Sequence, residues 1–291
     1  MEAEALDQVL DDLGDYATVL AGGPSLIPLL NMRLAAPANL VEINRITAVD
    51  HVDVDVDGVT VGAGARHVTV ERHDEAYGAV PLLRQALRLV AHPVIRNRGT
   101  TCGSIAHADP AGEMTAVLAL LGGTVRVASH GTDSRDITAD EFFVAPLESC
   151  LAPGELVTSA WFPRQPDTSG SAFVEIARRH GDYALCGIGA TVTLADDGTI
   201  EQARIGAISI HPTPLVVDCT EALSGAAAAA DALEAAAELV DAASEPEADL
   251  HATVTYRRHL TRVLTARALR DAAAHARHRS GGSPEGEDHD G

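Results

Sequence analysis

Two short glycine-bearing stretches, about eighty residues apart, constrain this chain more than any other feature. The first is Ala21-Gly22-Gly23-Pro24-Ser25, and the second is Thr100-Thr101-Cys102-Gly103-Ser104. Both combine small side chains with backbone amides, and such amides can gather around an anion because no bulky side chain is in the way. The pair therefore predicts that a phosphate-bearing group is held from two sides.

The first stretch interrupts a strand–helix–strand pattern. We expect a strand at Ala17–Leu20, a short helix from Ser25 to about Leu34 and a second strand at Leu40–Ile43. The glycines then lie where a helix N-terminus favours an anion. The stretch matches neither the dinucleotide G-x-G-x-x-G fingerprint nor the lysine-containing P-loop. All 21 basic residues are Arg, so phosphate binding has to depend on amides and Arg.

The second stretch follows Arg96 and Arg98 and leads into two acidic residues. Asp109 either accepts hydrogen bonds from ribose or ribityl hydroxyls or caps a helix over Ala111–Leu121, because Asp-Pro is a strong helix start. Glu113 lies one turn further on the same face and is either a ligand-binding group or a solvated helix residue. His107 is a possible base, although a single histidine beside a loop is more often structural.

The remaining pattern predicts an α+β chain. We expect one domain over residues 1–165, with subdomains of about 1–50 and 51–165. A linker is expected at Pro163–Gly170, which is rich in turn-forming residues. We expect a smaller α/β domain over residues 171–279, with a three-stranded antiparallel sheet and helices. We expect a disordered tail over residues 280–291. The other predicted elements are helices at 3–13, 76–91, 226–243 and 256–275, and strands at 51–57, 59–64, 124–128, 156–162, 172–178, 187–194 and 203–210.

Charge and hydropathy exclude several classes of partner. The formal net charge of −21 repels nucleic acid and anionic membranes. No apolar stretch of about twenty residues is present, which argues against a membrane span. Such acidity resembles proteins adapted to molar salt, so we expect a halophilic protein, the alternative being an ordinary acidic one. Because Met1-Glu2-Ala3-Glu4 lacks the basic start of a secretory signal, we expect a cytoplasmic location.

The chain offers no catalytic or metal-binding pattern of its own. Its four cysteines, Cys102, Cys150, Cys186 and Cys219, form no C-x-x-C pair, so neither a zinc site nor an iron–sulfur cluster is expected. We find no nucleophile elbow and no H-E-x-x-H motif. Any chemistry is therefore expected to come from a bound cofactor.

The two glycine stretches carry a resemblance to a known family. The segment Ala21–Leu34, continued by Leu40–Ile46, resembles the first FAD-contacting segment of the FAD-binding (medium) subunit of molybdenum hydroxylases. This family includes carbon-monoxide dehydrogenase medium subunits and the flavin domain of xanthine dehydrogenases. His92–Glu113 resembles the second segment, and Arg178–Leu185 and Tyr256–Leu260 are similar to stretches of the C-terminal domain. The resemblance covers nearly the whole chain except its tail.

The resemblance implies FAD as cofactor, held in a two-part region of the vanillyl-alcohol-oxidase (PCMH) type. It places Ala21, Gly22, Gly23, Pro24 and Ser25 and also Thr100, Thr101, Cys102, Gly103 and Ser104 around the pyrophosphate and ribityl chain. It further places Asp109 beside the second segment, Glu113 at an acidic cofactor contact, Val157 near the flavin ring and Tyr183 at an aromatic position close to that ring. Members often have Gly-Gly-Asn where this chain has Cys102-Gly103-Ser104, and some have a lysine where it has Val174.

The family also implies partners. A large subunit would hold the molybdenum cofactor and oxidise substrate with water, and a small subunit would carry two [2Fe–2S] clusters, together forming a dimer of heterotrimers. FAD on this chain would pass electrons to an external acceptor. Two alternatives stay open: a free-standing FAD-dependent oxidoreductase, which would turn over an organic substrate alone, and a flavin-less scaffold, favoured only by the Cys102 departure.

Overall fold

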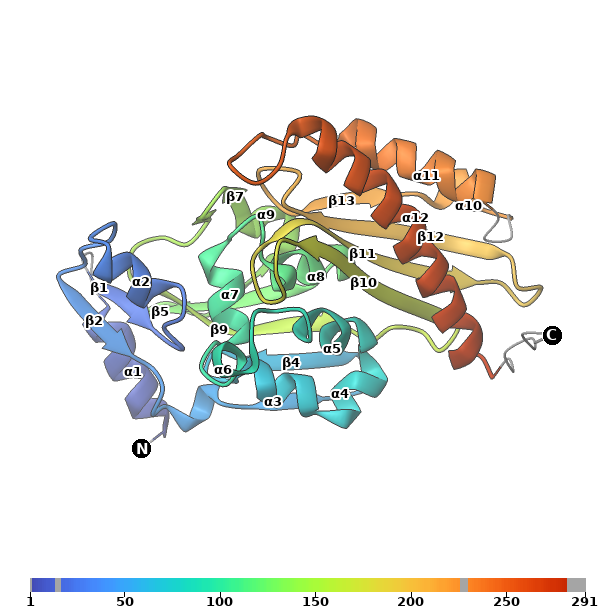
Figure 1. Cartoon of the computed structure of the whole chain (residues 1–291). Helices are drawn as coiled ribbons and strands as arrows, with labels where there is room; N and C mark the ends of the chain where they lie inside the picture. The colour runs from blue at the N-terminus through green and yellow to red at the C-terminus, as the bar shows by residue number, and fades with distance from the viewer. Residues whose placement is uncertain (1, 14–16, 226–229, 282–291) are drawn as a thin grey trace.

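The structure is a computed structural model that describes residues 2–13, 17–225 and 230–281. It contains both helices and sheets, as an α+β chain should (Figure 1). The strands are β1 (Ala17–Leu20), β2 (Asn39–Glu42), β3 (Val52–Val54), β4 (Gly58–Gly62), β5 (Thr124–Ser129), β6 (Arg135–Thr138), β7 (Phe143–Ala145), β8 (Glu148–Ser149), β9 (Glu155–Pro163), β10 (Ser169–Ala177), β11 (Ala184–Leu194), β12 (Ile200–Ile208) and β13 (Leu215–Asp218). The helices are α1 (Glu2–Asp12), α2 (Leu26–Asn31), the 3-10 helix η1 (Thr47–Val49), α3 (His67–Arg72), α4 (Asp74–Ala79), α5 (Pro81–Leu87), α6 (Pro93–Arg96), α7 (Thr101–His107), α8 (Glu113–Leu121), α9 (Ala139–Phe142), α10 (Thr220–Leu223), α11 (Ala230–Ala243) and α12 (Val254–Arg279).

The N-terminal end of the fold is the expected strand–helix–strand module. β1 pairs with β2 in parallel, with Ala17 opposite Asn39, and α2 connects them. The helix ends at Asn31, earlier than predicted, and the chain then turns through Arg33 with a φ of 58°. This module lies with α1 at one end of the molecule (Figure 1). It presents the turn after β1 toward the rest of the chain.

A five-stranded sheet in the order β3-β4-β9-β5-β6 forms the centre of the first half. Its inner face buries aliphatic side chains from β4, β5 and β9, as expected for a chain with only 3% aromatic residues. Helix α8 packs against β9 of this sheet and against β11, β12 and β13 of the next one. Its residues Met114–Leu120 are all buried, because the helix lies between two sheets and is apolar on every side.

The C-terminal sheet has four antiparallel strands in the order β10-β11-β12-β13 rather than the predicted three. The missed strand, β13, pairs with the middle of β12, where Asp218 lies opposite Arg204. It has only four residues, and a segment this short shows no alternation that sequence analysis can recognise. Its hydrogen bonding to β12 defines it as a strand. Helices α11 and α12 cover one face of this sheet (Figure 1).

The predicted helix over residues 76–91 is two helices. α4 ends before Val80 and α5 begins at Pro81, because proline has no N–H to donate and drives the preceding residue out of helical geometry. Val80 accordingly has φ −137° and ψ 78°. The predicted end of the first helix at residues 14–15, the start of the helix at 226–229 and the tail at 282–291 lie outside the described residues.

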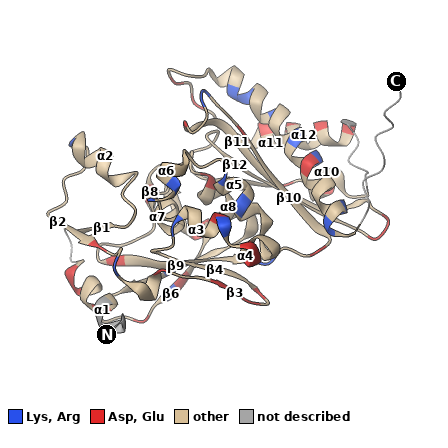
Figure 2. Ribbon diagram, turned by 60° about the horizontal axis from the view of Figure 1, so that its bottom comes forward, with Lys and Arg blue, Asp and Glu red and all other residues tan. Residues whose placement is uncertain are grey.

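Two hydrophobic clusters correspond to the two halves of the chain. Phe173, Ala184 and Ile208 of the C-terminal sheet nevertheless pack into the first cluster. The division into 1–165 and 171–279 therefore stays a prediction. No helix in the described part of the chain is both long and apolar enough to cross a bilayer. Acidic residues are spread over both halves rather than gathered on one face (Figure 2).

Candidate functional site

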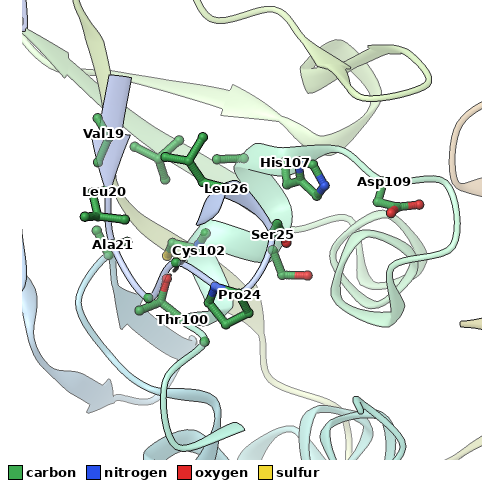
Figure 3. Close-up of a pocket in the computed structure, with 18 of the residues that line it drawn as sticks. Val19, Leu20, Ala21, Pro24, Ser25, Leu26, Thr100, Cys102, His107 and Asp109 are labelled. Carbon is green, nitrogen blue, oxygen red and sulfur yellow. Dashed lines mark hydrogen bonds between the residues drawn. The ribbon is translucent and has the colours of Figure 1, made fainter. Parts of the chain in front are cut away.

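A cavity of about 600 Å³ opens where the two glycine stretches meet. Its walls come from the turn between β1 and α2, from α7, from residues 151–157 before and within β9, and from residues 181–183 between β10 and β11. Figure 3 shows Ala21, Pro24 and Ser25 close to Thr100 and Cys102, with His107 and Asp109 further along the wall. Every residue predicted for the site lines this cavity except Thr101.

Thr101 lies beneath the cavity wall instead. It is fully buried, and its hydroxyl oxygen is 3.3 Å from Nδ1 of His67. His67 does line the cavity, although the sequence analysis did not select it. Burial, and then the charge of Arg96, lowers the pKa of His67 to about 4, so its imidazole is neutral at physiological pH. Thr101 therefore contacts His67, which is part of the cavity wall, rather than the cavity itself.

The first glycine turn has a specific reason for each glycine. A Cβ added at Gly22 would collide with the carbonyl oxygen of Arg98, so the first glycine turn touches, backbone to backbone, the segment just before the second stretch. Gly23 has a φ of +89°, which other residues rarely adopt. Within the described part of the chain, the amides of Gly22, Gly23 and Ser25 donate no hydrogen bond. Three open donors thus lie at the wall of the cavity.

The second glycine stretch is a helix start rather than a loop. Thr100 is the N-cap of α7: its hydroxyl accepts a hydrogen bond from the amide of Gly103 at 3.1 Å, and its carbonyl accepts one from Ser104 at 3.0 Å. These two amides are therefore engaged and cannot be offered to a phosphate as predicted. A Cβ at Gly103 would lie 2.5 Å from the Thr100 hydroxyl oxygen, so the cap requires glycine there.

Cys102 fits this helix without strain. Its thiol is buried and donates to the carbonyl oxygen of Val61 at 3.2 Å. Burial raises the pKa of the thiol to about 12, so Cys102 is neutral and inert. Arg96, expected near a phosphate, instead turns inward and pairs with Glu71 at 2.8 Å. The helical geometry of this stretch accommodates a side chain at position 102.

The acidic residues at the start of α8 face the cavity. Asp109 does not cap the helix: its carboxylate accepts from the amide of Ala111 at 2.8 Å, and the N-cap is Gly112. Glu113 is the first residue of the helix. Burial, and then the charge of Asp109, raises the pKa of Glu113 to about 7. A carboxyl group in this state can both donate and accept hydrogen bonds.

A second carboxyl group, Glu175 on β10, was missed by the sequence analysis. Burial, and then the charge of Glu113, raises its pKa to about 8. Its Oε2 atom is buried without a hydrogen-bond partner among the described residues. Nothing in a strand sequence marks such a residue, because only the packing of β10 near the start of α8 brings the two carboxyl groups together.

The last two predicted residues line the cavity in different surroundings. Val157, on β9, is buried and forms part of the apolar wall. Tyr183 is 66% exposed at the mouth. Partial burial, and then the charges of Asp109 and Glu113, raises the pKa of its hydroxyl. The segment between β10 and β11 thus reaches across the cavity toward the acidic residues.

Two family models match this chain. A family model described as the FAD binding domain in molybdopterin dehydrogenase matches residues 2–165, and one described as the CO dehydrogenase flavoprotein C-terminal domain matches residues 171–272. The chain belongs to the FAD-binding medium subunits of the molybdenum hydroxylases. It is an oxidoreductase flavoprotein, the FAD subunit of a complex of this type.

Individual relatives align with almost the whole length of this chain. The 6-hydroxypseudooxynicotine dehydrogenase complex subunit alpha of Paenarthrobacter nicotinovorans is 36% identical over 97% of this chain and 94% of its own length. The solved structure of reconstituted CO dehydrogenase from Oligotropha carboxidovorans superposes with a TM-score of 0.88 and 30% identity, covering 94% of this chain and 95% of that one. Quinoline 2-oxidoreductase from Pseudomonas putida 86 gives a TM-score of 0.88 and 31% identity over 93% of this chain and 95% of that one.

The cavity fits the cofactor that the family name implies. Open amides in the first glycine turn suit a pyrophosphate, and the carboxyl groups of Asp109 and Glu113 suit hydroxyl groups. The apolar wall around Val157 suits an aromatic ring system. The cavity has the size typical of small-molecule and cofactor sites.

Proposed function

We propose that FAD occupies this cavity with its pyrophosphate at Gly22, Gly23 and Ser25. The three open amides at the cavity wall are the observation that carries this assignment. Ala21 and Pro24 complete the turn, and Thr100, Cys102, Gly103 and Ser104 form the facing wall. Thr101 contributes through His67. We assign the region to the two-part vanillyl-alcohol-oxidase (PCMH) type.

The acidic side of the cavity would hold the more distant parts of the cofactor. Asp109 and Glu113 are placed to accept hydrogen bonds from hydroxyl groups, and the half-titrated Glu113 can also donate one near neutral pH. Val157 and Tyr183 would lie at the flavin ring. Bound FAD supplies the redox chemistry, whereas the residues of this chain bind it, orient it and limit its contact with water.

The proposed electron path passes from partner subunits through FAD to an external acceptor. All four cysteines are free and lie apart, which favours placing the [2Fe–2S] clusters on a separate small subunit. A large subunit would hold the molybdenum cofactor and oxidise the substrate. We further propose that these three subunits assemble as a dimer of heterotrimers, as the resemblance to the family implies.

The acid-rich composition supports a further proposal about surroundings. A formal net charge of −21, with Arg as the only basic residue type besides His, favours a cytoplasm with high salt. Salt screening would then reduce the repulsion between acidic side chains. Raising KCl from low to molar concentration should raise the midpoint of thermal unfolding, and an unchanged or lower midpoint would contradict halophilic adaptation.

The decisive experiment is an absorption spectrum of the tagged chain purified in molar salt, followed by chromatography of the released chromophore and identification of co-purifying subunits. Released FAD together with a molybdenum and an iron–sulfur subunit supports the proposal. FAD with turnover of an organic substrate by the isolated chain would favour a free-standing oxidoreductase. A colourless protein that rejects added FAD would favour a scaffold.

A further inference from the structure

The segment between β10 and β11 closes one side of the cavity. Its residues Gly181, Asp182 and Tyr183 line the cavity, although they belong to the C-terminal half of the chain. The opposite wall comes from the first half. Contacts between the two halves therefore help to place this segment, and one of them is made by a histidine that the cofactor-binding proposal does not use.

The ring of His92 packs directly on the backbone of Gly181. A Cβ added at Gly181 would lie 2.7 Å from both Cε1 and Nε2 of His92, and Gly181 has a φ of +84°. The ring of His180 meets the His92 ring edge-to-face, with centroids 5.5 Å apart and an interplanar angle of 68°. The imidazole of His92 thus contacts two successive residues of the segment that carries Tyr183.

The backbone just before His92 is held by the first half. Nη1 of Arg96 donates to the carbonyl oxygens of Val90 at 2.9 Å and Ala91 at 3.1 Å. These bonds fix the backbone just before His92, where Ala91 has a φ of 43° that a non-glycine residue rarely adopts. Nε of Arg96 pairs with Glu71 at 2.8 Å, and both side chains are largely buried. The support for His92 is therefore anchored on the core.

We propose that His92 is a positioning residue that holds the 180–183 segment over the cavity and thereby keeps Tyr183 at its mouth. The inference rests on the proposed function, because it concerns the retention of FAD in the same cavity. The contact consists of ring packing against a glycine backbone and a second ring, so its effect depends on a planar ring of this size at position 92. His92 acts through the segment and not on the reacting atoms.

The first test measures FAD release from the purified complex by the rise in free-flavin fluorescence after dilution. Loss of an aromatic contact should make release from His92→Ala about two- to tenfold faster, and His92→Phe, which keeps a planar ring, should restore release to near the original rate. His130→Ala removes an exposed histidine elsewhere and serves as the control. Release from His92→Ala at the original rate would overturn the proposal.

A second variant series asks whether His92 acts through Tyr183. In a Tyr183→Ala background, His92→Ala should add little to the release rate, because the group that it positions is already absent. Full additivity of the two changes would show that His92 acts elsewhere. Gly181→Ala, which introduces a Cβ into the His92 ring, should reproduce the faster release in a chain whose His92 is intact.

A third measurement is independent of FAD. Arg178 and Arg179 lie exposed beside the segment, so trypsin can report its mobility in the full chain. His92→Ala should accelerate cleavage there, and His92→Phe should not, with the thermal unfolding midpoints of both variants as the check on folding. If the chain binds no FAD, the proposed function fails while this test still decides the role of His92. Equal cleavage rates in a folded His92→Ala chain would contradict that role.

Discussion

Gly22 packs against the carbonyl oxygen of Arg98, so the turn after β1 and the segment before α7 touch without an intervening side chain. The two stretches are far apart in sequence, and their backbone contact forms one wall of the cavity. Glycine is thus needed at position 22 because the two segments leave no room for a Cβ. At position 23 it is needed because the backbone has a positive φ that other residues rarely adopt.

Replacing Gly23 by Val should strongly reduce FAD occupancy. Its φ of +89° disfavours a β-branched residue, and the added Cβ would lie 3.1 Å from Cγ1 of Ile27 beside the open amides. Occupancy is measured from the ratio of flavin to protein absorbance. Gly131→Val is the matched control, because Gly131 also has a positive φ, +70°, but has open space around it. Normal occupancy in Gly23→Val would remove the first turn from the site.

Gly22→Ala should weaken both FAD binding and the fold, because the new methyl group forces the two glycine stretches apart. We expect a loss of about 1–3 kcal/mol in the free energy of unfolding, as found for overpacked sites. Urea unfolding of the FAD-free chain measures this. Gly78→Ala, in α4 with nothing within 4 Å of the added Cβ, should be neutral or stabilising. A stable Gly22→Ala chain with full FAD binding would contradict the contact.

Glu113→Ala should weaken FAD binding while leaving the fold intact. The variant loses a partly buried carboxyl group that faces the cavity, and a hydrogen bond of this kind contributes about 1–3 kcal/mol, or roughly five- to hundredfold in affinity. Glu113→Gln, which keeps a donor and an acceptor, should lose less. Fluorescence titration of the FAD-free chain gives the affinities. Glu238→Ala, which removes an exposed residue of α11, is the control. Unchanged affinity in Glu113→Ala would remove Glu113 from the FAD-binding residues.

Glu175→Gln should make the folded chain less sensitive to alkaline pH. The pKa of Glu175 rises from its ordinary value of 4.5 to about 8 on folding. Between these values the unfolded chain has released a proton that the folded chain keeps, so the free energy of unfolding falls as pH rises. At pH above 8 the free energy of unfolding of the variant should exceed that of the original chain by about 2 kcal/mol. This is less than the whole pKa shift of Glu175 corresponds to, because solvent reaches part of the side chain.

The difference between Glu175→Gln and the original chain should shrink as pH falls toward 4.5 and vanish below it, where the Glu175 carboxyl is protonated in both the folded and the unfolded chain. Urea unfolding of the FAD-free chains from pH 5 to pH 9 checks the trend. Glu201→Gln, which changes an exposed residue of β12, should show no such pH dependence. A constant difference across the range would mean that Glu175 does not titrate as its burial requires.

The sequence alone determined the family, the order of most elements and the two glycine-bearing parts of the cavity wall. These properties depend on local patterns: the glycine turns, the strand–helix–strand spacing around Ser25 and the linker between β9 and β10. Each can be recognised from residues within about twenty positions of one another. Local patterns did not place Tyr183 and Val157 at the cavity, and only the family resemblance predicted them there.

Tertiary structure decided the features that depend on which distant segments meet. β13 is a strand because it pairs with β12, and Thr101 is buried where α7 packs next to His67 of another helix. The pKa values of Glu113 and Glu175 are raised because packing removes both from water near each other, and Gly181 receives the ring of His92 from the other half of the chain. Burial, close approach and long-range pairing arise only when the chain is folded. The periodicity and composition of a single segment therefore do not predict them.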